Sequence, residues 1–219
     1  TAYEIKECDW SSDVCSSDLL CICQAWLPIS MGNILDYENL NDIVNSDNAK
    51  EIQNSILDGS YRYCDDKSCS LIQANDLLDY KPSVNNFVNW INFALDSSCN
   101  LTCPSCRKEF IYTEEGPEHD YKIKLVDHII KLIEQHNKKL KFSVSGDGDS
   151  FASLVYRHLL TNLNVLNKDI EIEIVTNGIL AKSYWPKMTG IHKNVVRFKF
   201  SFDADRKSTR LNSSHIPLS

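Results

Sequence analysis

From Phe93 onward, the chain alternates between apolar runs with the two-residue period of β-strands and longer runs with the period of helices. Parallel strands need crossover connections of about this length, and these are usually helical. The pattern therefore predicts an α/β fold with about four βα units. Strands are expected at residues 93–97, 140–144, 170–176 and 196–202, the last with Val196, Phe198, Phe200 and Phe202 alternating with polar residues, and helices at 121–136, 151–162 and 181–188.

Three cysteines follow the first predicted strand with a spacing typical of metal ligands. Cys99, Cys103 and Cys106 are separated by three and then two residues. Three thiolates can cap three irons of a cubane cluster and leave the fourth iron without a protein ligand. A structural zinc site normally uses four ligands, so the spacing favours an iron–sulfur cluster. A zinc site and three unrelated buried thiols are the alternatives.

Both ends of the chain have the sequence expected of translated adapter DNA. The segments DWSSDVCSSDL (9–19) and DRKSTRLNSSH (205–215) can be encoded by strings that are reverse complements over nearly their whole length. These strings also match a common sequencing-library adapter, which residues 1–5 and 216–219 can extend. We therefore expect residues 1–19 and 205–219 not to be native and to make no packed contacts, and residues 20–204 to be an internal fragment.

The charge and hydropathy of residues 20–204 argue against several classes of partner. This segment has 19 basic and 24 acidic residues, so it is mildly acidic. Such a balance gives no electrostatic case for binding nucleic acid or an anionic membrane surface. No apolar run approaches the length of a membrane span. Cysteines grouped with metal-ligand spacing suggest a reducing compartment, so we expect a cytoplasmic protein.

Residues 20–85 are predicted to form a small, loop-rich module with four cysteines. Apolar residues from Leu40 to Leu57 have helical spacing, which Gly59 ends. A module of this size has a small apolar core, and a four-thiolate metal site would stabilise it. Residues 81–83 are the expected linker to the α/β segment. The four expected ligands are Cys21, Cys23, Cys64 and Cys69.

Polar residues follow the ends of the later predicted strands. In a β/α barrel the chemistry is carried by the carboxyl ends of the strands and the loops that follow them. A Gly-Asp-Gly stretch or an Asn-Gly pair is by itself more often a plain turn, but their coincidence on one edge favours a shared site. The candidate cofactor-binding residues at this edge are Gly146, Asp147, Gly148, Asp149, Thr176, Asn177, Ser201 and Asp203.

The cysteine stretch resembles the CxxxCxxC signature of radical SAM enzymes, with Ser105 where that family most often has an aromatic residue. The resemblance extends from about residue 92 to 204, and residues 86–204 are expected to be a truncated (βα)6 partial TIM barrel. It implies that Cys99, Cys103 and Cys106 hold a [4Fe–4S] cluster whose open iron is chelated by S-adenosylmethionine.

The same resemblance assigns roles to the other loops. Residues 146–149 stand where the family has a Gly-Gly-Glu-Pro motif that holds the amino group of S-adenosylmethionine, although Asp replaces Glu and the Pro is absent. Ser201 and Asp203 stand where relatives contact the ribose or carboxylate. Strands five and six of the family's barrel are not in this chain, so we expect the fragment to bind a cluster but to catalyse little turnover.

The N-terminal module resembles the SPASM domain, which carries auxiliary clusters in many radical SAM enzymes. The matching residues are 38–46 and 55–59, followed by Cys64. This resemblance implies an auxiliary [4Fe–4S] cluster at the four module cysteines, with a zinc site as the alternative. A SPASM domain more usually follows the barrel than precedes it.

Together these resemblances imply an enzyme that cleaves S-adenosylmethionine reductively and starts hydrogen abstraction. An external electron donor would be needed, and SPASM-bearing relatives suggest a peptide or protein substrate. The alternative from another class is a non-catalytic zinc- or iron–sulfur-binding protein or an electron-transfer protein.

Overall fold

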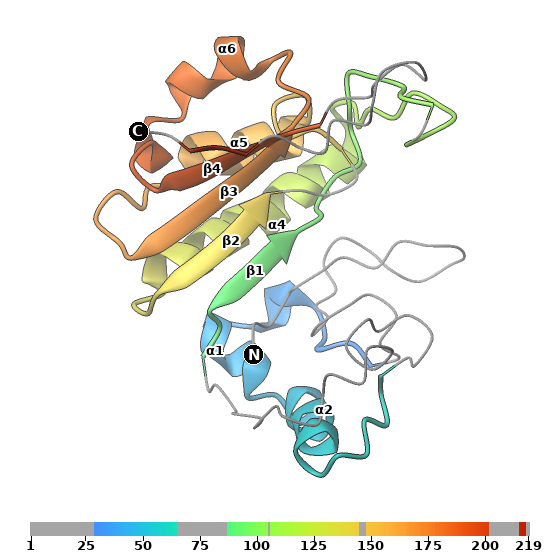
Figure 1. The fold of residues 1–219 in the computed structure, drawn as a ribbon, viewed down its shortest axis with the longest axis vertical. Helices are drawn as coiled ribbons and strands as arrows, with labels where there is room; N and C mark the ends of the chain where they lie inside the picture. Colours follow the sequence, from blue (N-terminus) through green and yellow to red (C-terminus); the bar gives the residue numbers. More distant parts are fainter. Residues whose placement is uncertain (1–28, 65–86, 105, 145–147, 202–214, 218–219) are drawn as a thin grey trace.

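The computed structural model describes residues 29–64, 87–104, 106–144, 148–201 and 215–217 (Figure 1). The first elements are η1 (Ile34–Asp36), α1 (Leu40–Val44) and α2 (Asp47–Leu57). The α/β segment contains β1 (Trp90–Phe93), α4 (Pro117–Gln135), β2 (Leu140–Val144), α5 (Leu154–Asn162), β3 (Ile170–Thr176), α6 (Ala181–Tyr184), η2 (Trp185–Lys187), η3 (Thr189–Ile191), β4 (Val195–Phe200) and β5 (His215–Pro217).

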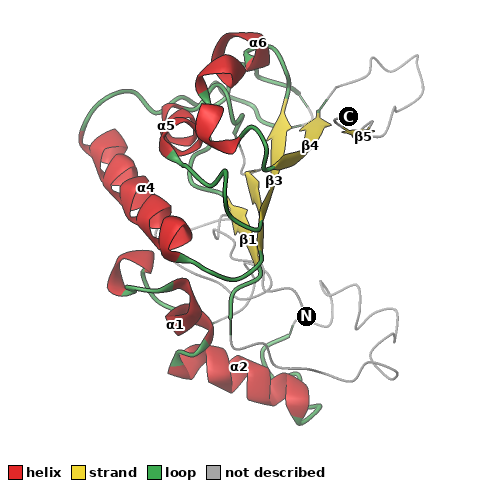
Figure 2. Ribbon diagram, turned by 90° about the vertical axis from the view of Figure 1, so that its left-hand side faces the viewer, coloured by secondary structure: helices red, strands yellow, loops and turns green. Residues whose placement is uncertain are grey.

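The sheet has the strand order β1-β2-β3-β4-β5. The first four strands are parallel, and β5 pairs antiparallel with β4 at the edge. Figure 2 shows α4 and α5 on the same side of the sheet. The α/β prediction is therefore confirmed for a four-stranded parallel sheet in which consecutive strands are neighbours.

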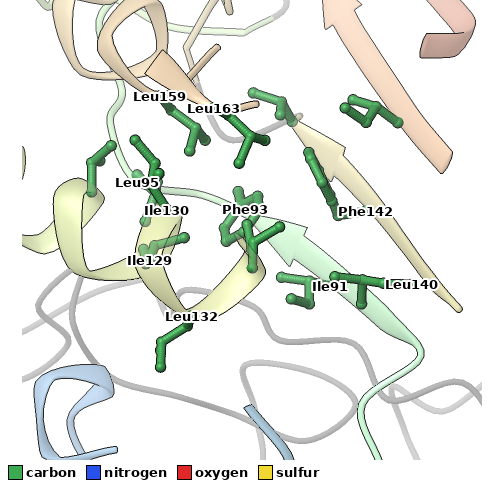
Figure 3. Packing of buried hydrophobic residues seen from close by; sticks show 14 of the residues in the cluster. Ile91, Phe93, Leu95, Ile129, Ile130, Leu132, Leu140, Phe142, Leu159 and Leu163 are labelled. Carbon is green, nitrogen blue, oxygen red and sulfur yellow. The ribbon is translucent and has the colours of Figure 1, made fainter. Parts of the chain in front are cut away.

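The main core lies between the sheet and the helices α4 and α5. Figure 3 shows strand residues Ile91, Phe93 and Phe142 facing Ile129 from α4 and Leu159 from α5. These side chains are at most 5% exposed. Full burial of one such side chain contributes about 1.5–3 kcal/mol, so this layer supplies much of the stability of the α/β segment.

The first strand begins three residues and ends four residues before the strand that the apolar pattern predicted. The expected strand was 93–97, whereas β1 ends at Phe93. Phe93 pairs with Val144, the last described residue before the gap at 145–147. The register of β1 therefore depends on its pairing with β2, which the periodicity of a single segment does not contain.

The fourth strand departs from simple alternation at Val196. Ile172 pairs with Val195 and Glu173 pairs with Arg197, so Val196 is an extra residue in β4, as in a β-bulge. Val195 is consequently buried, whereas Val196 is 45% exposed. The expectation that Val196 shares a face with Phe198 is therefore wrong.

The first two predicted helices are confirmed with altered starts, whereas the expected helix 181–188 is divided into the short α6 and the 3-10 helix η2. Helix α4 begins at Pro117, four residues before the expected start, because proline is well suited to the first helical turn. Helix α5 begins at Leu154 rather than residue 151, since Ser153 caps it by accepting a hydrogen bond from the Tyr156 amide (3.1 Å). The third strand, 170–176, agrees with the prediction.

The described part of the N-terminal segment is helical and packs on the α/β segment. Helices α1 and α2 confirm the helical spacing found between Leu40 and Leu57. The His128 Nε2 of α4 lies 2.8 Å from the Tyr37 carbonyl, and the Val88 amide donates to Asn41 Oδ1 (3.2 Å). The buried side chains of residues 29–64 belong to the same hydrophobic cluster as those of the sheet, so these residues do not form a separate core.

The structure tests the expectation of unpacked, non-native ends only for a few residues at the C-terminal end of the chain. Residues 1–19 lie outside the described residues, as do residues 205–214. Residues 215–217 form β5, so the expectation that the C-terminal segment makes no packed contact is wrong for these three residues. The exposed edge of β4 offers unpaired amide and carbonyl groups to any extended segment, which gives a physical reason for this pairing.

Within the described residues, no helix combines the length and the apolar character needed to cross a membrane.

Candidate functional site

The loop between β1 and α4 carries the three spaced cysteines. Its two arms are joined by hydrogen bonds, because the Cys99 amide donates to the Ile111 carbonyl (3.0 Å) and the Thr113 amide donates to Ser98 Oγ (2.7 Å). The two arms of the loop are therefore joined at Cys99, whereas residues 108–112 between them are exposed.

Cys103 and Cys106 lie in a turn within this loop. The amides of Cys106 and Arg107 both donate to the Cys103 carbonyl, at 2.9 and 3.0 Å. Arg107 Nη1 donates to the Ser97 carbonyl (2.7 Å), which ties the turn to the start of the loop. Cys99 and Cys103 are half-buried and Cys106 is exposed. Over the described ranges, no three His, Cys, Asp or Glu side chains are grouped closely enough to hold one metal ion.

Asp96, directly before this loop, is a buried carboxylate with several donors. Ser153 Oγ donates to Oδ2 (2.6 Å), while Thr113 Oγ1 (2.7 Å) and the Lys122 ammonium (3.1 Å) donate to Oδ1. Burial, the largest influence, opposes ionisation of Asp96. Hydrogen bonds from Ser153, Ser98 and Thr113, together with the Lys122 charge, nevertheless hold the pKa of Asp96 below its ordinary value.

The loops after β1 and β2 are in direct contact. The Asp149 amide donates to the Ser98 carbonyl (2.8 Å). A Cβ atom on Gly148 would lie 2.7 Å from the Asp96 carbonyl oxygen and closer still to that of Ser98. Position 148 therefore requires glycine, because only glycine allows the two backbones to approach this closely. The other two predicted residues of this loop, Gly146 and Asp147, lie outside the described residues.

The Asp149 carboxylate accepts hydrogen bonds from the loops after β2 and β3 and so connects them. Oδ1 accepts hydrogen bonds from the amides of Phe151 (2.9 Å) and Ala152 (3.0 Å). Oδ2 accepts from Thr176 Oγ1 (2.8 Å) and the Asn177 amide (2.7 Å). With four donors and 2% exposure, Asp149 has a structural role that the sequence pattern did not predict.

Asn177 connects the loop after β3 to the cysteine loop. Its Nδ2 donates to Asn100 Oδ1 (2.8 Å) and lies 3.8 Å from the Cys99 sulfur. Its Oδ1 accepts from the Ile179 amide (3.0 Å), which fixes the orientation of the side-chain amide. Three predicted site segments, after β1, β2 and β3, are therefore joined at one edge of the sheet.

The last predicted residues of this edge are only partly described. Ser201 is exposed, and its amide donates to the Thr176 carbonyl (2.9 Å), so it lies beside the end of β3. Asp203 lies outside the described residues.

Of the four module cysteines, only Cys64 is described. It is half-buried, and its amide donates to the Tyr61 carbonyl (2.9 Å). Cys21, Cys23 and Cys69 lie outside the described residues. Convergence of these four thiols therefore stays a prediction.

Sequence reasoning missed the structural importance of Asp96, Lys122 and Ser153. A polar residue at the end of an apolar run was a visible signal for Asp96. Lys122 lies four residues after Glu118 in α4, a spacing that favours an ion pair, and the two side chains are 3.0 Å apart. Nothing in the sequence indicates the contact of Lys122 with Asp96.

No protein-family model, no curated protein and no solved structure matches this chain.

Proposed function

We propose that this chain is a radical SAM enzyme, or a part of one, in which Cys99, Cys103 and Cys106 bind a [4Fe–4S] cluster. The observation that carries the proposal is the joining of three loops at the carboxyl edge of the sheet. The Asp149 amide reaches the loop after β1, and the Asn177 side chain reaches Asn100 in that same loop.

The topology supports the barrel part of the proposal. Consecutive parallel strands with α4 and α5 on one side match the arrangement of a β/α barrel, in which helices lie outside and loops at the carboxyl ends form the site. The proposal takes β1 to β4 as four strands of a (βα)6 partial barrel.

The chemistry of the donor set also fits an iron–sulfur cluster. Thiolates are the soft ligands that iron–sulfur clusters use, and all three belong to one loop, so assembly requires only local movement of that loop. The close backbone approach at Gly148 brings the β2 loop to the base of the cysteine loop. Gly146, Asp147, Ser201 and Asp203 are the further residues proposed to face S-adenosylmethionine.

The residues of the chain then have separable tasks. Asp96 and Asp149 hold the three loops in place through buried hydrogen bonds, and Asn177 places an N–H group near the Cys99 sulfur. When bound, the cluster and S-adenosylmethionine supply the radical chemistry, while the protein supplies binding, orientation and exclusion of water. The proposed substrate class is a peptide or protein, with an external electron donor and a cytoplasmic location.

Anaerobic reconstitution with iron and sulfide tests the proposal. We expect visible absorbance of a [4Fe–4S] cluster and a change in its electron paramagnetic resonance spectrum when S-adenosylmethionine is added. Cys103→Ala should abolish that spectral change. Cys64→Ala is the matched control, since it removes a thiol of the proposed auxiliary site and should leave the response to S-adenosylmethionine intact.

Two outcomes would count against the proposal. Retention of iron by Cys103→Ala, with no response of the wild-type protein to S-adenosylmethionine, would indicate a non-catalytic iron–sulfur protein. Stoichiometric zinc binding that excludes iron at the same cysteines would indicate a structural zinc site.

A further inference from the structure

A buried glutamate lies in the middle of the sheet, away from the proposed cofactor edge. Glu173 in β3 is 1% exposed. Its carboxylate forms ion pairs with Lys141 of β2 (2.6 Å), Arg197 of β4 (3.1 Å) and Lys199 of β4 (2.8 Å). One carboxylate is thus contacted by three cations from the two neighbouring strands.

These residues share the face of the sheet opposite α4 and α5. In β3, Ile172 and Ile174 point into the helix-covered core, so Glu173 between them points to the other face. Glu173 is in register with Arg197, which places that side chain on the same face. Since Glu173 precedes the last residue of β3 by three positions, it lies about 10 Å from the carboxyl edge along the strand.

The cluster carries an excess of positive charge. In the part of the chain that the structure describes, Glu173 is the only carboxylate within ion-pair distance of Lys141, Arg197 and Lys199. Burial opposes ionisation of Glu173, but Lys141 and Lys199 hold its pKa below the ordinary value, so one negative charge faces three positive ones. By contrast, Lys139 and Glu171 form a one-to-one pair at 2.9 Å.

The three cations remain partly accessible. The side chains of Lys141, Arg197 and Lys199 are 28%, 43% and 33% exposed. Arg197 contacts Glu173 through one terminal nitrogen, which leaves other guanidinium N–H groups in its planar fork. Glu173 orients the three cations toward one another, and like charges held together in this way favour binding of a further anion.

We propose that Lys141, Arg197 and Lys199 form an oxyanion-binding site, which takes a phosphate or carboxylate group of a ligand. Arginine binds both groups through paired N–H donors, and lysine adds point charge. Lys141, Arg197 and Lys199 lie on strands β2 and β4 and not in the loops at the carboxyl edge, and binding of an anion to them does not require the proposed iron–sulfur cluster.

Isothermal titration of the full chain at low ionic strength tests the site with two probes, inorganic phosphate and succinate. Tighter binding of phosphate assigns a phosphate ligand, and tighter binding of succinate assigns a carboxylate ligand. Arg197→Gln and Lys199→Gln should each weaken binding of the preferred probe about tenfold, the value expected for loss of one charged hydrogen bond. Lys139→Gln is the matched control and should bind as the wild type does.

Glu173→Gln distinguishes a binding site from a purely structural network. Removal of the resident carboxylate leaves the three cations without their internal partner, so binding of the added anion should become tighter. A structural network predicts the opposite, because its loss would disorder the cations. Circular dichroism and the melting temperature of each variant check that the compared proteins are folded.

A second measurement on the wild-type protein covers the case in which a variant does not fold. The preferred probe should slow acetylation of Lys141 and Lys199 by an amine-reactive reagent, whereas the acetylation rate of Lys139 should be unchanged. Mass spectrometry measures the rate at each lysine. The proposal is overturned by an absence of saturable binding, by equal protection of Lys139, or by weaker binding to Glu173→Gln.

Discussion

Buried carboxylates lie both at the carboxyl edge of the sheet and on the sheet face opposite α4 and α5, but the groups that contact them differ between the two regions. Asp149 accepts hydrogen bonds from uncharged donors on two loops, and Asp96 has one cation among several uncharged partners. Glu173 is contacted by three cations. Uncharged donors hold backbone segments in place without adding charge, whereas the cations around Glu173 leave a positive excess. The first arrangement suits positioning, and the second suits binding.

The largest expected effect is at Asp96. Asp96→Ala removes the acceptor of Ser153, Thr113 and Lys122 in a buried place, so the free energy of unfolding should fall by about 3–5 kcal/mol, as when one partner of a buried pair is removed. Urea denaturation measures it. Asp120→Ala is the control, since the Asp120 side chain is 79% exposed and its loss should leave the midpoint nearly unchanged. Equal effects for the two variants would show that the buried network is unimportant.

Asp149→Ala should have the next largest effect. Four donors lose their acceptor, and two of them are backbone amides at the start of the segment leading into α5, so we expect about 2–3 kcal/mol of destabilisation. The loops after β2 and β3 should also exchange their amide hydrogens faster. Asp127→Ala, at an exposed residue that pairs with His158, is the control. Faster exchange confined to α5 would contradict the bracing role across the two loops.

The pH dependence of stability should reflect both types of carboxylate. The pKa values of Asp96 and Glu173 are lower in the folded state than their ordinary values, so the stabilisation is present above about pH 4 and is lost as the pH falls through the folded pKa values. Melting temperatures from pH 6 to pH 3 should therefore fall less steeply for Asp96→Asn than for the wild type. An unchanged slope would mean that Asp96 does not titrate with unfolding.

The smallest expected effect concerns the contact between the loops after β3 and β1. A double-mutant cycle with Asn177→Ala and Asn100→Ala should give a coupling free energy of about 0.5–1 kcal/mol, typical of one uncharged hydrogen bond. The cycle of Asn177→Ala with Asn162→Ala should give no coupling, because Asn162 bonds to His158 within α5. Coupling in both cycles would indicate a general loss of stability instead of a local link.

Local sequence patterns determined much of the fold. The alternation of Ile170, Ile172 and Ile174 with glutamates identified β3 with its correct ends, and helical spacing identified α1, α2, α4 and α5. Consecutive strands and crossover helices also predicted the parallel sheet, because such connections have few other ways to pack. The order of the candidate loops along one edge followed from that topology alone.

Tertiary structure decided the features that depend on a partner. The register of β1 is set by its pairing with β2, and the bulge at Val196 is set by pairing with β3. Asp149 was predicted to lie at the carboxyl edge, but its role in connecting two loops depends on donors from another loop. The charge cluster of Glu173 depends on three residues from two other strands. Periodicity records which side chains avoid water along one segment, whereas these contacts join segments that are distant in sequence and meet only when the sheet is assembled.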